Sequence, residues 1–481
     1  MSRWTGGPVD RWTGNALALV ALALATRMNA QQIDRAVRPP AAPRPSFKFP
    51  AVRTHTLANG LRLLVVEDHS IPVVAVRAII RGDSTWDPAG KEGLYAVTVG
   101  ALREESDARG GDDLARAAAT IGTTVAPTGF TTVASAFEPA LGLMAELLTK
   151  PTFDSSAIER RKATQAAAAR RVAQAPVTVP RHLFYELVYG DTDPFVRSLV
   201  PTEESIQSIT RADVVHSYDA FFSPRTTTLA IAGDVSDSAA LDAATRVFGS
   251  WRQRGERSAA DIVGVGDQSP RTRIYVRDVP GAGEQAYLYV GELGPSRIDP
   301  DAVATEAFAA VASARLQESL REKRSFIYSS TTGITWRRAR GEGTFVGSTT
   351  VSAQKVDSAL VEWLRVLREL RTTRPPTQGE LDAVRRSRVG ALPARIDGPD
   401  SIVARLVEIA RDELPLDFLE RYANQMSSVT LADVTAAAAR HVDLDHLVIV
   451  VTGDARVLEP VLRAANLAPV TVFKPPARPA P

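Results

Sequence analysis

Hydrophobic and polar positions change their period repeatedly along the chain, and each change predicts a new element. Thr54–Glu67 is strand-like on both sides of Asn59-Gly60, a pair that forms tight turns, and therefore predicts a β-hairpin. Pro72–Arg81 is rich in β-branched residues and predicts a strand. Helix-like and strand-like stretches follow one another from Phe47 onward, and the strands are expected to alternate apolar and polar residues. This order predicts an α+β fold.

Helix boundaries are marked by charged, glycine and proline residues. Asp112-Asp113 predicts the start of one helix, which ends at Gly122. Glu138-Pro139 predicts the start of another, which ends before Pro151. Both halves of the chain contain apolar residues at helical spacing, which we assign to the core. These are Leu141, Met144 and Leu148 in the first half, and Leu360, Trp363, Leu364, Leu367 and Leu370 in the second.

A pattern from the first half returns in the second. In the first half, a Gly-Asp pair follows the segment Ile209–Val214 and the predicted strand Thr228–Ala232. In the second half, another Gly-Asp pair follows the segment Val429–Val434 and the predicted strand Leu447–Val451. Asp213 aligns with Asp433 and Asp234 with Asp454, both at an offset of 220 residues. An internal duplication explains this order best. We therefore predict two similar α+β domains, at 47–251 and 272–473, joined by a linker at 252–271 and followed by a Pro-rich tail at 474–481.

Composition excludes several classes of protein. The 481 residues are 44% hydrophobic and 23% charged, as in soluble globular proteins, and the net charge is only +2. No dense Lys/Arg run is present, so nothing in the sequence points to nucleic acid. The chain has no cysteine, which excludes disulfides, thiolate metal sites and a Cys nucleophile.

The N-terminal segment has the pattern of an export signal. Arg3 and Arg11 precede Ala16–Ala25, an apolar run of ten residues, whereas a membrane span needs about 20. We predict a signal peptide at 1–30, a Pro-rich linker at 31–46 and export to the periplasm. Cleavage after Ala25 or after Ala30 fits equally well, and an uncleaved anchor or a misassigned start remains the alternative.

An ordered set of short motifs carries a family resemblance. The set begins with Leu57-Ala-Asn-Gly-Leu61, Arg81-Gly82 and Gly93-Leu94, continues with Leu147–Arg160, and includes Tyr189-Gly190 and both Gly-Asp turns. Over about 420 residues this order resembles the mitochondrial-processing-peptidase-like branch of the insulinase/pitrilysin zinc metallopeptidase family. The resemblance implies two homologous domains, each a β-sheet backed by helices, that form half of a clamshell enclosing unfolded peptides.

The zinc motif of that family is missing from this chain. Active members carry His-x-x-Glu-His after the Gly-Leu pair, and these positions fall on Ala96, Val99 and Gly100. The family's third ligand falls within 164–169, which contains no carboxylate. Glu104 and its neighbour Glu105 are expected to be solvated charges. No histidine pair at helical spacing replaces the motif among His55, His69, His182, His216, His441 and His446. We predict that this chain holds no metal.

A second family motif is complete. Leu320–Tyr328 resembles the segment that sends an Arg and, seven residues later, a Tyr into the active site, and Arg321 and Tyr328 fill both positions. The resemblance makes these two the expected catalytic residues. Arg324 competes for the Arg role, but its spacing to Tyr328 fits less well. The alternative is that the segment is a charged helix end followed by a strand.

The resemblance implies a non-zinc subunit of a heterodimeric metallopeptidase. The partner would be a homologue carrying His-x-x-Glu-His and its zinc, the substrates would be unfolded peptides, and Arg321 and Tyr328 would complete the partner's site. The alternative is a catalytically inactive scaffold or peptide-binding protein of the cell envelope. A third hypothesis is an envelope assembly factor tethered by its uncleaved N-terminal segment.

Overall fold

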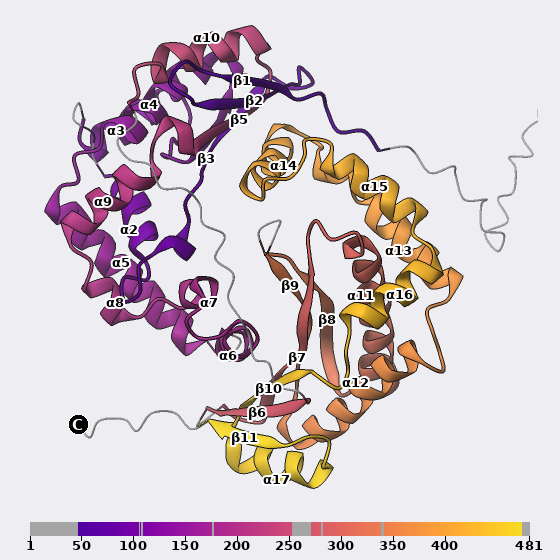
Figure 1. Cartoon of the computed structure of the whole chain (residues 1–481). Coiled ribbons are helices and arrows are strands. Elements are labelled where there is room, and N and C mark those ends of the chain that lie inside the picture. Colours follow the sequence, from indigo (N-terminus) through magenta and orange to yellow (C-terminus); the bar gives the residue numbers. More distant parts are fainter. Residues whose placement is uncertain are drawn as a thin grey trace, which may run out of the picture. The chain divides into compact units, whose positions relative to one another are not determined.

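The structure is a computed structural model that describes residues 47–104, 106, 109–175, 178–252, 271–279, 282–337 and 341–473. The predicted signal peptide, the Pro-rich linker, most of the 252–271 linker and the C-terminal tail lie outside the described residues. The fold is α+β, with two sheets flanked by helices (Figure 1). Within the described part of the chain, no helix is both long enough and apolar enough to cross a membrane.

The first sheet has the strand order β1-β2-β5-β3-β4. Its central strand β5 runs parallel to β2 and antiparallel to β3. The hairpin predicted at Asn59-Gly60 is confirmed: β1 and β2 are antiparallel neighbours, and Gly60 has a φ of 93°, which glycine adopts readily. The strands are β1 (Arg53–Thr56), β2 (Arg62–Glu67), β3 (Val73–Ile80), β4 (Gly129–Val133) and β5 (Thr227–Gly233).

The second sheet has the order β11-β6-β10-β7-β9-β8. Its strand β10 runs parallel to β6 and antiparallel to β7, so the run β6-β10-β7-β9 has the same order and directions as β2-β5-β3-β4. The strands are β6 (Arg273–Asp278), β7 (Gln285–Ser296), β8 (Ile327–Thr335), β9 (Glu342–Ser352), β10 (Val448–Gly453) and β11 (Val470–Phe473).

One face of each sheet is covered by helices of the same half of the chain. In the first half these are α2 (Leu94–Ala101), α3 (Gly111–Thr120), α4 (Phe137–Thr149), α5 (Ser155–Gln174), α8 (Glu203–Gln207), α9 (Arg211–Phe221) and α10 (Asp237–Phe248). In the second half they are α11 (Ala302–Gln317), α12 (Val356–Arg371), α13 (Gln378–Gly390), α15 (Phe418–Ser428), α16 (Leu431–His441) and α17 (Ala455–Ala465). The two predicted apolar stripes lie on α4 and α12 and are buried.

The opposite face of each sheet is covered by the other half of the chain. Helix α14 (Pro399–Arg411) packs on the first sheet, while α6 (Thr178–Tyr189) and α7 (Pro194–Leu199) pack on the second. Residues from Phe47 onward accordingly form one compact unit. The alternation expected of the strands fails at the centre, where every residue of β10 is buried, because both faces of that strand are covered.

The two segments with repeated sequence have the same local structure. Thr210 begins α9 with a capping box: Asp213 N–H donates to its hydroxyl at 3.2 Å, and Thr210 N–H donates to the Asp213 carboxylate at 2.8 Å. Thr430 and Asp433 begin α16 with the same two bonds at the same distances. Each helix is followed by the central strand of its sheet. The two segments therefore share a helix cap and the strand position that follows it.

Candidate functional site

Helix α2 carries the three positions of the missing zinc motif. Ala96, Val99 and Gly100 form its partly exposed side, and the opposite side is buried in the core. The helix is capped by Asp87, whose carboxylate accepts hydrogen bonds from the N–H groups of Gly93 and Tyr95, both at 2.8 Å. Burial raises the pKa of Asp87 to about 7, although the two donors act in the opposite direction. The helix is therefore retained as a structural element without ligands.

Helix α5, which contains the segment of the third zinc ligand, packs against α2. Ala166 and Ala169 are buried in the same hydrophobic cluster as Leu94 and Val97 of α2. Methyl groups therefore occupy the contact between the two helices where active members are expected to place a carboxylate. Neither helix offers a metal ligand at these positions.

Arg161 of α5 covers the end of the zinc motif. A Cβ added at Gly100 would lie 3.0 Å from Cδ of Arg161 and 3.4 Å from its Cγ. The guanidinium of Arg161 is hydrogen-bonded to Glu104, which also accepts from Arg160 at 3.0 Å. Burial of Glu104 opposes its ionisation, but these two hydrogen bonds hold its pKa below the usual value. The expectation that Glu104 is a solvated charge is wrong, because its side chain is only 17% exposed and anchors both arginines.

Arg321 and Tyr328 lie against each other at the start of the second half's edge strand. Arg321 belongs to a π-helical turn (Glu318–Lys323) that follows α11, and Tyr328 is the second residue of β8. The guanidinium carbon of Arg321 is 5.5 Å from the centroid of the Tyr328 ring. Both side chains are exposed, that of Tyr328 by 85%. A large aromatic ring and a cation are therefore presented together to solvent.

The backbone around this pair is irregular at three successive points. The π-helical turn is followed by Ser325 with a φ of 52°, which is uncommon for a residue other than glycine. Ser325 N–H donates to the carbonyl of Arg321 at 3.0 Å and so closes the turn. A β-bulge follows, because Ile327 pairs with Val351 but Ser330 pairs with Thr349, which leaves an extra residue in β8 beside Tyr328. π-Helical turns and bulges are frequent next to functional sites.

Arg324, the rival for the Arg role, points to a different partner. Its guanidinium lies 3.0 Å from a carboxylate oxygen of Glu362 on α12, and over the ring of Phe326. The Glu362 side chain is only 4% exposed. The structure therefore brings Arg321, and not Arg324, to Tyr328.

Comparison with known proteins supports the family resemblance. Residues 208–388 match the family model described as peptidase M16 inactive domain, a range that contains the Arg321–Tyr328 pair. A search of curated proteins found no match. A crystal structure of a peptidase M16 inactive domain from Pseudomonas fluorescens is 26% identical, with a TM-score of 0.73 over 84% of this chain and 98% of that chain.

These two matches support the insulinase/pitrilysin (M16) peptidase family that the sequence motifs predict.

Two further structures share the fold of this chain. The first half of the periplasmic protease PqqL from Escherichia coli is 11% identical, with a TM-score of 0.70 over 89% of this chain and all 100% of that chain. A chain of complex III2 from Candida albicans, solved with Inz-5 bound, is 15% identical, with a TM-score of 0.69 over 86% and 99% of the two chains. The predicted family and fold class are confirmed, and the matched model is that of catalytically inactive, peptidase-like chains.

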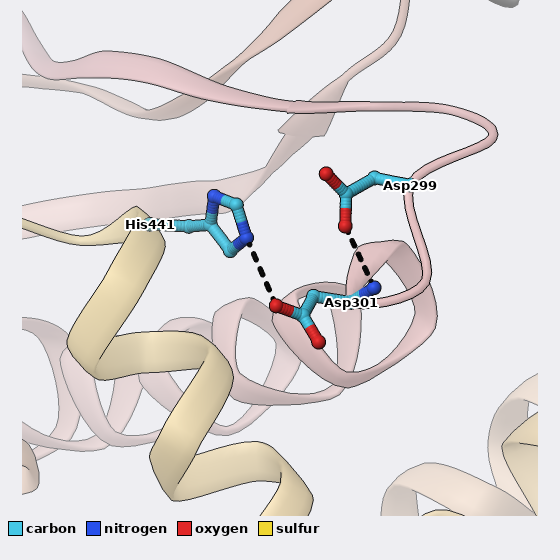
Figure 2. A group of neighbouring side chains, drawn as sticks. All are labelled: Asp299, Asp301 and His441. Atoms are coloured by element: carbon cyan, nitrogen blue, oxygen red, sulfur yellow. Dashed lines mark hydrogen bonds and ion pairs between the residues drawn. The ribbon is translucent and has the colours of Figure 1, made fainter.

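The described residues of this chain contain one group of three side chains close enough to share a metal ion: Asp299, Asp301 and His441 (Figure 2). Asp299 accepts from the N–H of Asp301 at 2.8 Å at the start of α11. One oxygen of Asp301 faces both His441 Nε2 at 3.2 Å and the guanidinium of Arg440 at 2.6 Å. Because Arg440 already places a positive charge on that oxygen, the group is best explained as a cluster of charged side chains that ties the end of α16 to the start of α11.

Sequence reasoning did not identify the residues that surround these sites. Asp87, Arg161 and Glu362 contact the zinc-motif helix or the Arg/Tyr segment, but no local pattern marks the distance in sequence between each of them and its partner. Even Asp87 lies six residues before Gly93, whereas a capping residue is expected directly ahead of its helix.

Proposed function

We propose that this chain is the non-zinc subunit of a heterodimeric metallopeptidase that binds unfolded peptides. The chain supplies Arg321 and Tyr328 to the zinc site of a homologue that carries His-x-x-Glu-His. The observation that carries the proposal is the exposed pair itself: Tyr328 is 85% exposed, and Arg321, also exposed, lies over its ring.

The chemistry of the two residues suits peptide hydrolysis. A zinc ion bound by the partner would supply the activated water. The Tyr328 hydroxyl can donate a hydrogen bond to the oxyanion that develops on the peptide carbonyl. The Arg321 guanidinium is permanently charged and can hold a carbonyl or carboxylate of the bound peptide. The contact of the Arg321 guanidinium with the ring, 5.5 Å from its centroid, keeps the two groups next to each other, so that both can act on one bound peptide.

The proposal places zinc in the partner and no cofactor in this chain. The contact between α2 and α5 supports this division, because Arg161 lies against Gly100 and the buried Ala166 and Ala169 have no atom that can bind an ion. The predicted export signal supports a periplasmic location.

The test mixes the purified chain with a zinc-bearing homologue from the same organism. Neither chain alone should cleave a quenched fluorescent peptide, and the mixture should. Tyr328→Phe removes one hydroxyl with little change in shape and should lower turnover by about 100- to 1,000-fold. Arg321→Ala should also raise KM, because it removes a charge that holds the peptide before reaction. Size-exclusion chromatography checks that both variants still assemble with the partner.

Lys323→Ala is the matched control. Lys323 belongs to the same turn and pairs with Glu318 at 2.7 Å, with both side chains more than half exposed. Its removal should leave turnover unchanged. Equal activity of wild type, Tyr328→Phe and Arg321→Ala would refute the assigned roles.

The alternative is a catalytically inactive scaffold or peptide-binding protein. The likeness in fold to a chain of complex III2 is the observation that favours it. This alternative is correct if no zinc-bearing homologue yields activity while the chain still binds unfolded peptides or a partner.

A further inference from the structure

A charged pocket lies behind the turn that carries Arg321. Its volume is about 340 Å³, and it opens between the π-helical turn and α12. Five cationic side chains and three carboxylates line it, with Ser319 and Val366: Arg315, Lys323, Arg324, Arg365, Arg374, Glu318, Glu362 and Glu369. Arg321 is not among the lining residues, because it points to Tyr328 instead.

Glu362 binds the turn from inside this pocket. One carboxylate oxygen of Glu362 accepts a hydrogen bond from the Ser319 hydroxyl, and the other lies 3.0 Å from the Arg324 guanidinium. Arg365, one turn further along α12, donates to both oxygens at 2.6 and 2.9 Å. Glu362 therefore contacts residues two positions before Arg321 and three positions after it.

These contacts place Arg324 at Glu362 and leave Arg321 at Tyr328. Arg321 and Arg324 lie three residues apart, and both have side chains long enough to reach the exposed ring of Tyr328. The buried Glu362 carboxylate binds Arg365 and, of the two arginines of the turn, Arg324. Hydrogen bonds from Arg365, aided by Ser319, hold the pKa of Glu362 down to about 2, so the carboxylate stays charged at neutral pH.

We infer that Glu362 is a positioning residue: by holding Ser319 and Arg324 in the pocket, it fixes the π-helical turn so that Arg321 alone lies over Tyr328. Its effect on catalysis rests on the proposed function, but its effect on the turn does not. Glu362 itself touches neither the exposed pair nor a substrate and acts through Arg321.

The first test measures the turn directly, on the full purified chain, by hydrogen–deuterium exchange. Ser325 N–H and Phe326 N–H donate to the carbonyls of Arg321 and Leu320 at 3.0 and 2.8 Å, and so report whether the turn is closed. Glu362→Gln keeps the size of the side chain but loses its charge. Amide exchange in peptides that span 318–328 should rise about tenfold or more, while exchange in the first sheet stays unchanged.

Glu369→Gln is the matched control for charge. Glu369 lies two turns along the same helix, lines the same pocket and also binds Arg365, but its other partner is Arg374 and not the turn. Its exchange pattern over 318–328 should match wild type. If Glu362→Gln lowers overall stability, Ser319→Ala removes one contact without changing charge and should still speed exchange in the turn. Wild-type exchange at 318–328 in both Glu362→Gln and Ser319→Ala would overturn the inference.

The second test uses the active mixture and a double-mutant cycle. Glu362→Gln should lower turnover by about 10- to 100-fold, because a small displacement of a positioned group has effects of this size. In the Arg321→Ala background the same change should have little further effect, whereas a general loss of stability would lower both equally. If the wild-type mixture is inactive, the proposed function fails, and the exchange measurement still decides whether Glu362 positions the turn.

Discussion

Restoring the zinc motif by substitution should produce neither a zinc site nor a stable helix contact. The triple change is Ala96→His, Val99→Glu and Gly100→His. The structure adds a steric obstacle to the missing third ligand, because a Cβ at position 100 would lie 3.0 Å from Cδ of Arg161. Ordinary carbon contacts are about 3.5–4.0 Å, so Arg161 must move for the Cβ alone, and further for an imidazole ring.

The expected loss of stability follows from the contacts that hold Arg161 in place. Its guanidinium is bound to Glu104, whose side chain is 17% exposed, so displacing Arg161 disrupts a partly buried ion pair as well as packing. Overpacking of this kind typically costs about 1–3 kcal/mol. Even a displaced Arg161 leaves a positive charge beside any bound zinc. Two histidines also fall short of the three protein ligands that catalytic zinc sites use.

The assay combines elemental analysis after dialysis with thermal unfolding. The triple variant should hold well under one zinc per chain and melt at a lower temperature than wild type. Ala96→His with Val99→Glu, which leaves Gly100 in place, is the control and should lose less stability. Adding Arg161→Ala to the triple variant should recover part of the loss. The reasoning is refuted if the triple variant binds one zinc per chain at wild-type stability.

Three further outcomes are expected. Burial raises the pKa of Glu292 to about 8, so the folded chain keeps a proton that the unfolded chain releases above its ordinary pKa of 4.5. The contribution of Glu292 to the free energy of unfolding is therefore largest below pH 4.5 and should fall by about 1.4 kcal/mol per pH unit from about pH 5 to pH 8. Melting curves of Glu292→Gln should lack this pH dependence. Gly347→Ala would place a Cβ 2.2 Å from Cζ2 of the buried Trp363, so it should lower the melting temperature clearly, whereas Gly333→Ala, with open space around it, should not. Mass spectrometry of the native protein should find a chain that begins between residues 26 and 31, and an intact Met1 would favour the tethered hypothesis.

Local sequence patterns determined most elements of this protein. The turn at Asn59-Gly60 lies where the sequence predicts it, because it depends on residues within a few positions of one another. The repeated segments at 209–214 and 429–434 likewise begin helices with the same capping box. The sequence also showed that the zinc positions lack ligands, and it showed the spacing between Arg321 and Tyr328. Residue identity alone settles whether a side chain can bind a metal.

Tertiary structure alone decided what surrounds those elements. Periodicity fixes which side of an element is apolar but not which element covers it, so α14 on the first sheet and α6 on the second could not be predicted. The same holds for Arg161 over Gly100 and for Glu362, which binds Arg324 and leaves Arg321 for Tyr328. These contacts join segments that are dozens of residues or more apart, and their geometry follows from the packing of whole helices rather than from any local pattern.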